Sequence, residues 1–241
     1  MTEYYIPNHV HCAIDADAAV FLDLRTDQYH MLLGAKARAF EDLLSRAPDL
    51  FRRAIRLDCP ASKNDQTLSS TLVMELLENN LLTVETPDRP FPSPPHIPTP
   101  DCNLIDYETR DPTLMRNSDV LRFLGACVVA KYRLKWTSIE SVVGTVERRN
   151  RCGATVPLDL GKVRNLVRIY RRLRPLLPME FTCLDDSLSL LEFLARYQCF
   201  PHWVFAIQLE PWAAHCWVQY DSVTFNEDSD VARTYLPVMM V

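Results

Sequence analysis

The sequence predicts an α+β protein with a winged-helix-like unit at its N-terminus and a second unit in which helices pack on a small antiparallel sheet. Short strand-like runs precede amphipathic helices in the first part, and a long helical region precedes strand-like runs in the last part. Helices and strands grouped in this way are typical of α+β folds rather than of alternating βαβ folds. A proline-rich stretch separates the two parts, and 241 residues suffice for two small domains.

The first unit is expected over residues 1–86. Apolar runs bounded by polar turn residues predict strands over 9–14, 18–24, 28–32 and 81–85. Apolar residues that recur every three or four positions predict one helix that begins at Gly34 and another over 67–80. Three strands, two helices and a closing strand together suggest a small winged-helix-like unit.

A linker is expected over residues 87–110. Seven prolines lie between Pro87 and Pro100. Because proline fixes φ and has no N–H to donate, neither a helix nor a central strand is expected in this stretch. The alternative is an irregular surface loop within a single domain. With the linker in place, the second unit spans residues 111–241.

The second unit is expected to begin with helices and to end with strands. Helical periodicity covers residues 113–150 and 160–178. A third helix is expected after Thr182, because threonine is a favoured residue at a helix N-cap. Apolar runs then predict strands over 202–209, 213–220 and 223–226.

Charge is distributed unevenly along the chain. The net charge is −8 over residues 1–109, +10 over 110–174 and −7 over 175–241. The basic block over 110–174 indicates either a solvated helix surface or a docking face for an acidic partner. No helix-turn-helix, zinc-finger or aromatic-interleaved pattern accompanies it, so nucleic-acid binding is not expected.

Membrane insertion, export and metal binding are not expected from the sequence. No apolar run reaches the roughly 18 residues of a membrane span, and the N-terminal segment lacks the features of a signal peptide. The eight cysteines form no Cys-x-x-Cys pair, which predicts reduced thiols in a cytoplasmic protein. His9 and His11 alternate with Cys12 across a strand, which disfavours a shared metal ion.

A cysteine, a histidine and a nearby acid of the second unit indicate nucleophilic catalysis. Cys183 begins the helix that follows Thr182, where free N–H groups can lower the pKa of a thiol and hold an oxyanion. Two aspartates in the same turn oppose thiolate formation unless they point away. His215 lies on a predicted strand, and two candidate acids, Glu227 and Asp228, follow the next one. A cysteine, a histidine and an acid in this order can form a triad in which the thiolate attacks a carbonyl and the imidazole carries the proton.

The segment VHCAIDADAAVFLDLRTDQYHMLLGAKARAFEDLL, with LVMELLENNLL after it, resembles the PqqD-like domains that recognise leader peptides of ribosomal peptide precursors. In that family the leader adds as an extra strand beside the third strand and packs on the third helix. The resemblance therefore implies a groove between residues 28–32 and 68–77. The candidate lining residues are Tyr29, Met31, Leu72 and Leu76, and ordinary core packing is the alternative for each of them.

The second half contains the motifs C-L-x-x-S-L-x-L, F-P-x-W-V-F, P-W-A-A-H-C-W-V-Q and F-N-E. Through these motifs it resembles the lasso peptide biosynthesis B protein, which is the leader peptidase of lasso peptide maturation. The layout of the chain is that of the fused form of this family. The resemblance implies a transglutaminase/papain-like fold with Cys183 as the nucleophile and His215 as the general base and acid. The family usually has aspartate where Glu227 stands, so Asp228 is a rival third member. An arginine of the family motif is replaced by Asp186.

The same resemblance implies a cytoplasmic cysteine peptidase that binds the leader of a precursor peptide and cuts it from the core. It also implies a partner, an asparagine-synthetase-like lasso cyclase. The five glycines of the chain form no phosphate-binding loop. No bound cofactor is therefore expected, and any requirement for ATP would act through the cyclase. One alternative is a non-catalytic module that presents the leader to the cyclase, and another is an acyltransferase that uses the same triad.

Overall fold

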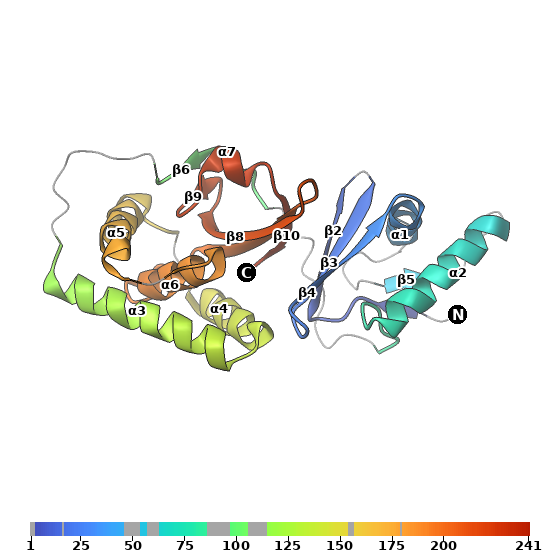
Figure 1. Ribbon diagram of the computed structural model, residues 1–241, viewed down its shortest axis with the longest axis horizontal. Coiled ribbons are helices and arrows are strands. Elements are labelled where there is room, and N and C mark those ends of the chain that lie inside the picture. Colours follow the sequence, from blue (N-terminus) through green and yellow to red (C-terminus); the bar gives the residue numbers. More distant parts are fainter. Residues whose placement is uncertain are drawn as a thin grey trace. The chain divides into compact units, whose positions relative to one another are not determined.

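The protein is described by a computed structural model that covers residues 3–15, 17–45, 54–56, 63–85, 97–105, 115–153, 157–178 and 180–241. It has a mixed α+β architecture and divides into two compact units, Met1–His96 and Ile97–Val241 (Figure 1). None of the helices in these ranges is long and apolar enough to cross a membrane.

The first unit contains an antiparallel sheet in which three consecutive strands pair in the order β2-β3-β4. The strands are β2 (Val10–Asp15), β3 (Ala18–Asp23) and β4 (Gln28–Leu33). Asp23 accepts hydrogen bonds from the backbone N–H of Arg25 and the hydroxyl of Thr26, which stabilises the turn into β4. These three strands lie within one residue of the ranges predicted from the sequence.

Two helices complete the core of the first unit, α1 (Ala35–Ser45) and α2 (Lys63–Glu78). Gly34 has a φ of 57°, a left-handed conformation that suits glycine at the turn before α1. Phe40 of α1 packs edge-on against Phe21 of β3, with 4.9 Å between the ring centroids. Leu72 and Leu76 of α2 are buried in the same core.

A second pair of strands in this unit was not predicted from the sequence. Strand β1 (Glu3–Tyr5) pairs with β5 (Ala54–Arg56) in antiparallel fashion. The prediction of a strand over 81–85 is wrong, because this segment forms only an isolated bridge to β1. Tyr5 and Thr83 exchange two backbone hydrogen bonds of 2.7 and 2.8 Å there. Pairings of this kind join distant segments and leave little trace in the local pattern of apolar residues.

The second unit is built on a five-stranded sheet with the order β10-β7-β8-β9-β6. Its strands are β6 (Cys102–Asn103), β7 (His202–Gln208), β8 (Ala213–Tyr220), β9 (Val223–Thr224) and β10 (Leu236–Met240). All neighbours pair antiparallel except β6, which runs parallel to β9. The three strands predicted from the sequence are present, and β6 and β10 extend the sheet at its two edges.

Helices cover this sheet in layers, with α6 between the strands and α3 (Figure 1). The helices are α3 (Asn117–Trp136), α4 (Ile139–Gly153), α5 (Leu160–Leu173), α6 (Cys183–Ala195) and α7 (Ser229–Ala232). A short 3-10 turn, η2 (Arg174–Leu176), follows α5. Helix α6 is buried along most of its length, and the buried residues include polar ones such as Ser187, Ser189 and Glu192. The sheet and the outer helices thus hold the N-terminus of α6 in place.

Two expectations about the second unit need correction. The single helix predicted over 113–150 is two helices, because Thr137 adopts an extended conformation with φ −128° and ψ 154°. The hydroxyl of Thr137 donates to the carbonyl of Arg133 at 2.7 Å and so helps to terminate α3. The helix predicted over 160–178 ends at Leu173, where Pro175 in the following turn cannot continue the α-helical hydrogen bonds.

Part of the predicted linker over 87–110 belongs to the second unit. Strand β6 lies within it, and the carbonyl of Pro98 accepts a hydrogen bond of 2.7 Å from Nε2 of Gln219 on β8. The division between the units falls after His96, inside the predicted linker. Residues 87–96 and 106–110 lie outside the described residues.

Candidate active site

The N-terminus of α6 is fixed by a capping box. Thr182 is the N-cap, and its hydroxyl oxygen accepts a hydrogen bond from the backbone N–H of Asp185 at 3.2 Å. The carboxylate of Asp185 in turn accepts from the backbone N–H of Thr182 at 3.1 Å. This reciprocal arrangement satisfies two backbone donors that a helix end leaves free, and it makes Cys183 the first residue of the helix.

Cys183 is half-buried and lies beside residues of β8. The pKa of its thiol is lowered to about 4, first by a hydrogen bond from the thiol of Cys216 and then by one from His215. Burial alone would raise the pKa of this thiol. The two hydrogen bonds and the positive charge of the imidazole together outweigh that effect. Cys216, almost fully buried, has its own pKa raised by the same contact and by burial. The structure therefore favours Cys183 as a thiolate with Cys216 as its thiol donor.

His215 lies on β8 between the thiol of Cys183 and a carboxylate. Its Nε2 forms an ion pair with Oε2 of Glu227. The pKa of His215 is raised to about 9, chiefly by the hydrogen bond to Cys183 and then by that to Glu227. The ring also packs near Tyr235, with 5.2 Å between the ring centroids. Because Glu227 engages Nε2, the remaining nitrogen, Nδ1, is the one available to Cys183.

The structure places Glu227, and not Asp228, at the imidazole. Burial alone would raise the pKa of Glu227, but the hydrogen bond from His215 and another from the backbone N–H of Asp228 lower it. The carboxylate of Asp228 caps α7 instead, since it accepts from the backbone N–H groups of Asp230 at 2.7 Å and Val231 at 3.3 Å. The longer glutamate side chain thus takes the position next to the histidine.

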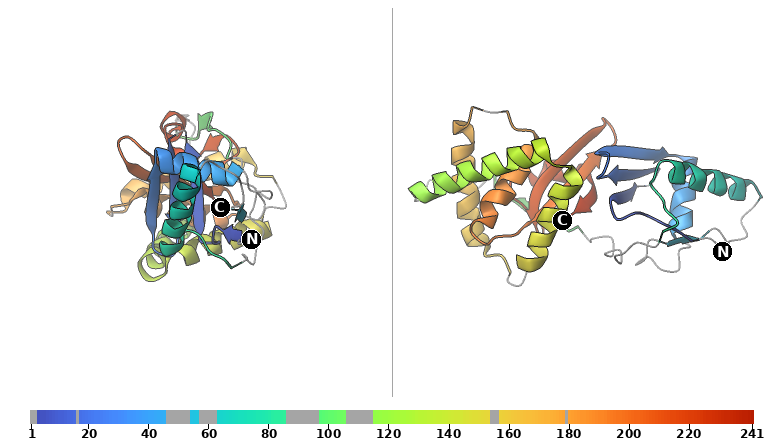
Figure 2. Two further views of the ribbon diagram at one scale, coloured as in Figure 1. Left: turned by 90° about the vertical axis from the view of Figure 1, so that its right-hand side faces the viewer. Right: turned by 90° about the horizontal axis from the view of Figure 1, so that it is seen from below.

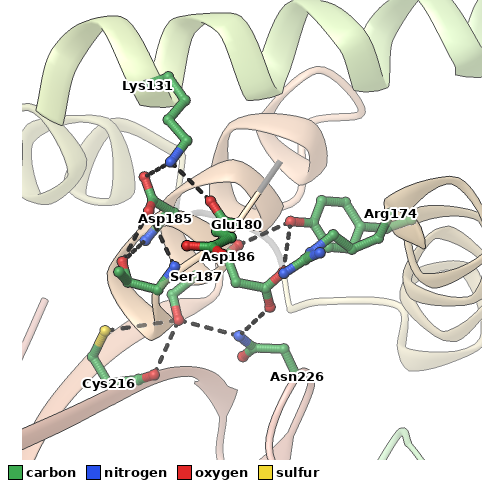
Figure 3. Close-up of polar contacts among 10 residues, drawn as sticks. Lys131, Arg174, Glu180, Asp185, Asp186, Ser187, Cys216 and Asn226 are labelled. Carbon is green, nitrogen blue, oxygen red and sulfur yellow. Dashed lines mark hydrogen bonds and ion pairs between the residues drawn. The ribbon is translucent and has the colours of Figure 1, made fainter. Parts of the chain in front are cut away.

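The two aspartates in the first turn of α6 are paired with cations. Asp185 forms an ion pair of 2.9 Å with Lys131 of α3, which also donates to the carbonyl of Glu180 (Figure 3). Asp186 forms an ion pair of 3.0 Å with Nε of Arg174. These cations offset the negative charge that the two carboxylates would otherwise present near Cys183.

Asp186 also joins α6 to the segment that carries Glu227. Its Oδ2 accepts a hydrogen bond of 3.1 Å from Nδ2 of Asn226, and Asn226 also donates to the hydroxyl of Ser187 (Figure 3). The side-chain oxygen of Asn226 accepts from the backbone N–H of Val218 on β8 at 2.8 Å. Asn226 is therefore held on both sides, and it directly precedes the carboxylate that contacts His215.

The four candidate leader-binding residues lie in the first unit and have different environments. Leu72 and Leu76 are each 1% exposed and pack in the core, so their side chains do not line an open groove. Tyr29 and Met31 lie on β4, where Tyr29 is half-buried and Met31 is 42% exposed. Strand β4 is at the edge of the sheet formed by the described strands. The structure thus brings the two β4 residues together on one strand and assigns the two leucines to core packing.

Sequence reasoning assigned no role to three residues that support this site. Cys216 directly follows His215, and its approach to Cys183 depends on how β8 faces α6. Asn226 belongs to the quoted F-N-E motif, which marks its place without indicating its contacts. Arg174 lies 12 positions before Asp186, so that only the packing of α5 against α6 brings the two together. Among the described residues, no group of three potential ligands could hold a metal ion.

Residues 126–240 match the sequence profile of the transglutaminase-like superfamily. The matched range begins within α3, ends in β10 and contains Cys183, His215 and Glu227. The C-terminal part of the chain is therefore a transglutaminase-like domain, a class that includes cysteine peptidases and transglutaminases. Comparisons with curated proteins and with solved structures found no match.

Proposed function

We propose that this protein is a cysteine peptidase in which Cys183 is the nucleophile, His215 the general base and acid, and Glu227 the residue that orients His215. The observation that supports this most directly is the continuous set of contacts from the thiol through the imidazole to the carboxylate. The match of residues 126–240 to the transglutaminase-like superfamily, a class that includes cysteine peptidases, also supports the proposal.

The first half of the reaction forms a thioester. With the pKa of Cys183 at about 4 and that of His215 at about 9, the thiolate and the imidazolium coexist at neutral pH. The thiolate attacks the scissile carbonyl, and the backbone N–H of Cys183 at the start of α6 is the candidate donor to the oxyanion. As the C–N bond breaks, His215 donates its proton to the departing amine. The C-terminal fragment leaves with a free α-amino group.

The second half releases the N-terminal fragment. His215, now neutral, takes a proton from a water molecule that attacks the thioester carbonyl. When the C–S bond breaks, the fragment leaves as a carboxylic acid, and the thiolate and the imidazolium are restored. Glu227 stays ionised throughout and stabilises the imidazolium that forms in each cycle.

The proposed substrate is the leader segment of a lasso peptide precursor. This assignment is supported by the resemblance of both halves of the chain to the fused lasso peptide biosynthesis B protein and by the position of β4 at the end of the sheet formed by the described strands. A leader could add to β4 as a further strand, with main-chain hydrogen bonds for affinity and Met31 as a side-chain contact. An asparagine-synthetase-like cyclase that uses ATP would then act on the new α-amino group.

The test is cleavage of the precursor peptide encoded beside this protein, with the neighbouring cyclase and ATP present. We expect the wild-type protein to release an intact leader fragment, detected by mass spectrometry, and Cys183→Ala to release none. Cys152→Ala is the matched control, because Cys152 is exposed on α4 and outside the site. Equal processing by the wild type and Cys183→Ala would contradict the peptidase proposal and favour a non-catalytic module that presents the leader.

Transfer to an amine is the second candidate reaction, since the superfamily also includes transglutaminases. The same thioester can react with an amine in place of water, and the two products differ in mass. Adding a small primary amine to the assay distinguishes them. A leader fragment that carries the amine in place of a free carboxylate would favour an acyltransferase.

A further inference from the structure

Helix α3 carries a row of large apolar side chains on its solvent-exposed side. Their positions follow one another at intervals of three or four residues, so that they form one continuous line along the helix. We name this row the α3 stripe. Its members are Leu121 (70% exposed), Leu124 (40%), Val128 (68%), Tyr132 (63%) and Trp136 (67%).

The α3 stripe is not needed to bury α3 in its own unit. The opposite side of the helix already packs against α6 through buried residues such as Phe123, Ala126 and Ala130. In the view from below, α3 lies at the front of the second unit with no other segment drawn over it (Figure 2). A single exposed apolar residue is ordinary, whereas a contiguous exposed row usually marks an interaction site.

The charges beside the stripe are positive. Exposed Lys135 lies over the ring of Trp136, with 5.2 Å from Nζ to the ring centroid. Exposed Arg122 follows Leu121 on the flank of the stripe, and its guanidinium carbon lies 4.6 Å from the centroid of the Tyr197 ring. The acidic residue of α3 is Asp119, which is buried and accepts a hydrogen bond from Tyr197. A second copy of this chain would bring the same cations against these. Charge complementarity therefore favours an acidic partner over self-association.

We propose that the α3 stripe binds an amphipathic helix of another protein, one with apolar side chains on its contact face and glutamate or aspartate on its flanks. From Leu121 to Trp136 the stripe is about 22 Å long, at about 1.5 Å per residue. A partner helix of about four turns matches this length, and its side chains pack between those of the stripe as ridges into grooves.

The test uses two synthetic peptides of about 18 residues, or about five helical turns. Both have leucines along one face, and their flanks carry glutamate in one and lysine in the other. Binding to the full chain is followed by fluorescence anisotropy. We expect the glutamate peptide to bind and the lysine peptide to bind much more weakly. Equal binding of the two peptides would overturn the proposal, because it would remove the role of charge.

Two variants of the full chain locate the binding site. Val128→Glu places a charge at the centre of the stripe, and we expect it to weaken binding of the glutamate peptide about tenfold or more. Leu176→Glu is the matched control, since Leu176 is 73% exposed on η2 and should leave binding unchanged. Unchanged binding by Val128→Glu would overturn the proposal. So would a wild-type dimer that Val128→Glu dissociates, because the stripe would then serve a second copy.

This inference is independent of the peptidase proposal. Val128 lies outside the contacts among Cys183, His215 and Glu227, so Val128→Glu should keep the reactivity of Cys183 with iodoacetamide. Loss of that reactivity would show that the variant is misfolded. The smaller substitution Val128→Ser then replaces it in the binding assay, with the same expected loss.

Discussion

The charge on Cys183 depends on contacts that a few atoms make. The Cys216 thiol and the His215 imidazole lower its pKa, and Glu227 in turn stabilises the protonated imidazole. Because Cys183 has a depressed pKa, its thiolate is present above about pH 4 and is lost as the pH falls through that value. Because His215 has a raised pKa, its imidazolium persists until the pH rises through about 9. The ion pair is therefore expected between these two limits.

The first prediction concerns Glu227→Gln, which removes the negative charge beside His215. We expect the pKa of His215 to fall and that of Cys183 to rise, so that the pH midpoint for alkylation of Cys183 by iodoacetamide moves up by about one unit or more. One unit corresponds to about 1.4 kcal/mol. The rate is measured by mass spectrometry of the peptide that contains Cys183.

Asp228→Ala is the matched control for this prediction. It removes the N-cap of α7 and should lower the free energy of unfolding by about 1 kcal/mol without moving the alkylation midpoint. A midpoint that moves in Asp228→Ala and stays in place in Glu227→Gln would show that Asp228 is the acid that supports His215.

The residue types of the site could be predicted from sequence, but the choice between Glu227 and Asp228 could not. The two acids are adjacent in the sequence. A shift of one residue at the end of β9 would point the side chain of Asp228, instead of that of Glu227, toward His215. What separates them is the helix α7, whose first N–H groups engage Asp228. That helix is only four residues long and leaves no periodic pattern in the sequence.

At the scale of elements, the site depends on how α6 is joined to its neighbours. Asp186 connects α6 to Arg174 after α5 and to Asn226 before Glu227. Tyr170 of α5 adds a hydrogen bond to the carbonyl of Asp186 at 3.0 Å. These contacts position three segments that are distant in sequence, and they give a physical reason for an aspartate at this place.

The second prediction concerns Asp186→Leu, which removes the two carboxylate oxygens that accept hydrogen bonds and keeps a side chain of similar size. We expect the segment at Asn226 to loosen, which weakens the support of His215 by Glu227 and raises the alkylation midpoint of Cys183, as in Glu227→Gln. The rise should be smaller than in Glu227→Gln, because the Arg174 charge left without Asp186 favours the thiolate. Asp186→Asn keeps an oxygen for Asn226 and should restore part of the shift. Asp230→Ala changes an exposed acid on α7 and serves as the control. If Asp186→Leu keeps the wild-type midpoint, Asp186 is structural only.

Helices and central strands were predicted more closely than edges and breaks. Strand β8 has the predicted bounds because its apolar run is long and bounded by turns. The short edge strand β6 and the break at Thr137 depend on partners elsewhere in the chain, such as the pairing of Cys102 with Val223. Local patterns cannot report contacts of this kind.

At the scale of the whole molecule, each of the two units has buried core packing of its own. The core of the first unit is centred on Phe21 and Phe40, and that of the second unit includes Phe123 and Phe193. Each unit is compact by itself, and domains with their own cores usually unfold as separate units. Loss of packing in one should therefore leave hydrogen bonds of the other protected from exchange.

The third prediction follows from this division. Phe40 is fully buried, so Phe40→Ala should destabilise the first unit by about 3–5 kcal/mol. Hydrogen exchange should speed up over residues 10–45, while α6 and β8 keep wild-type protection and Cys183 keeps its alkylation profile. Phe193→Ala, which removes an equally buried ring of the second unit, should do the reverse. If each variant exposes both units to the same extent, the two cores unfold together, and the leader-binding and catalytic roles proposed for them cannot be separated by mutation.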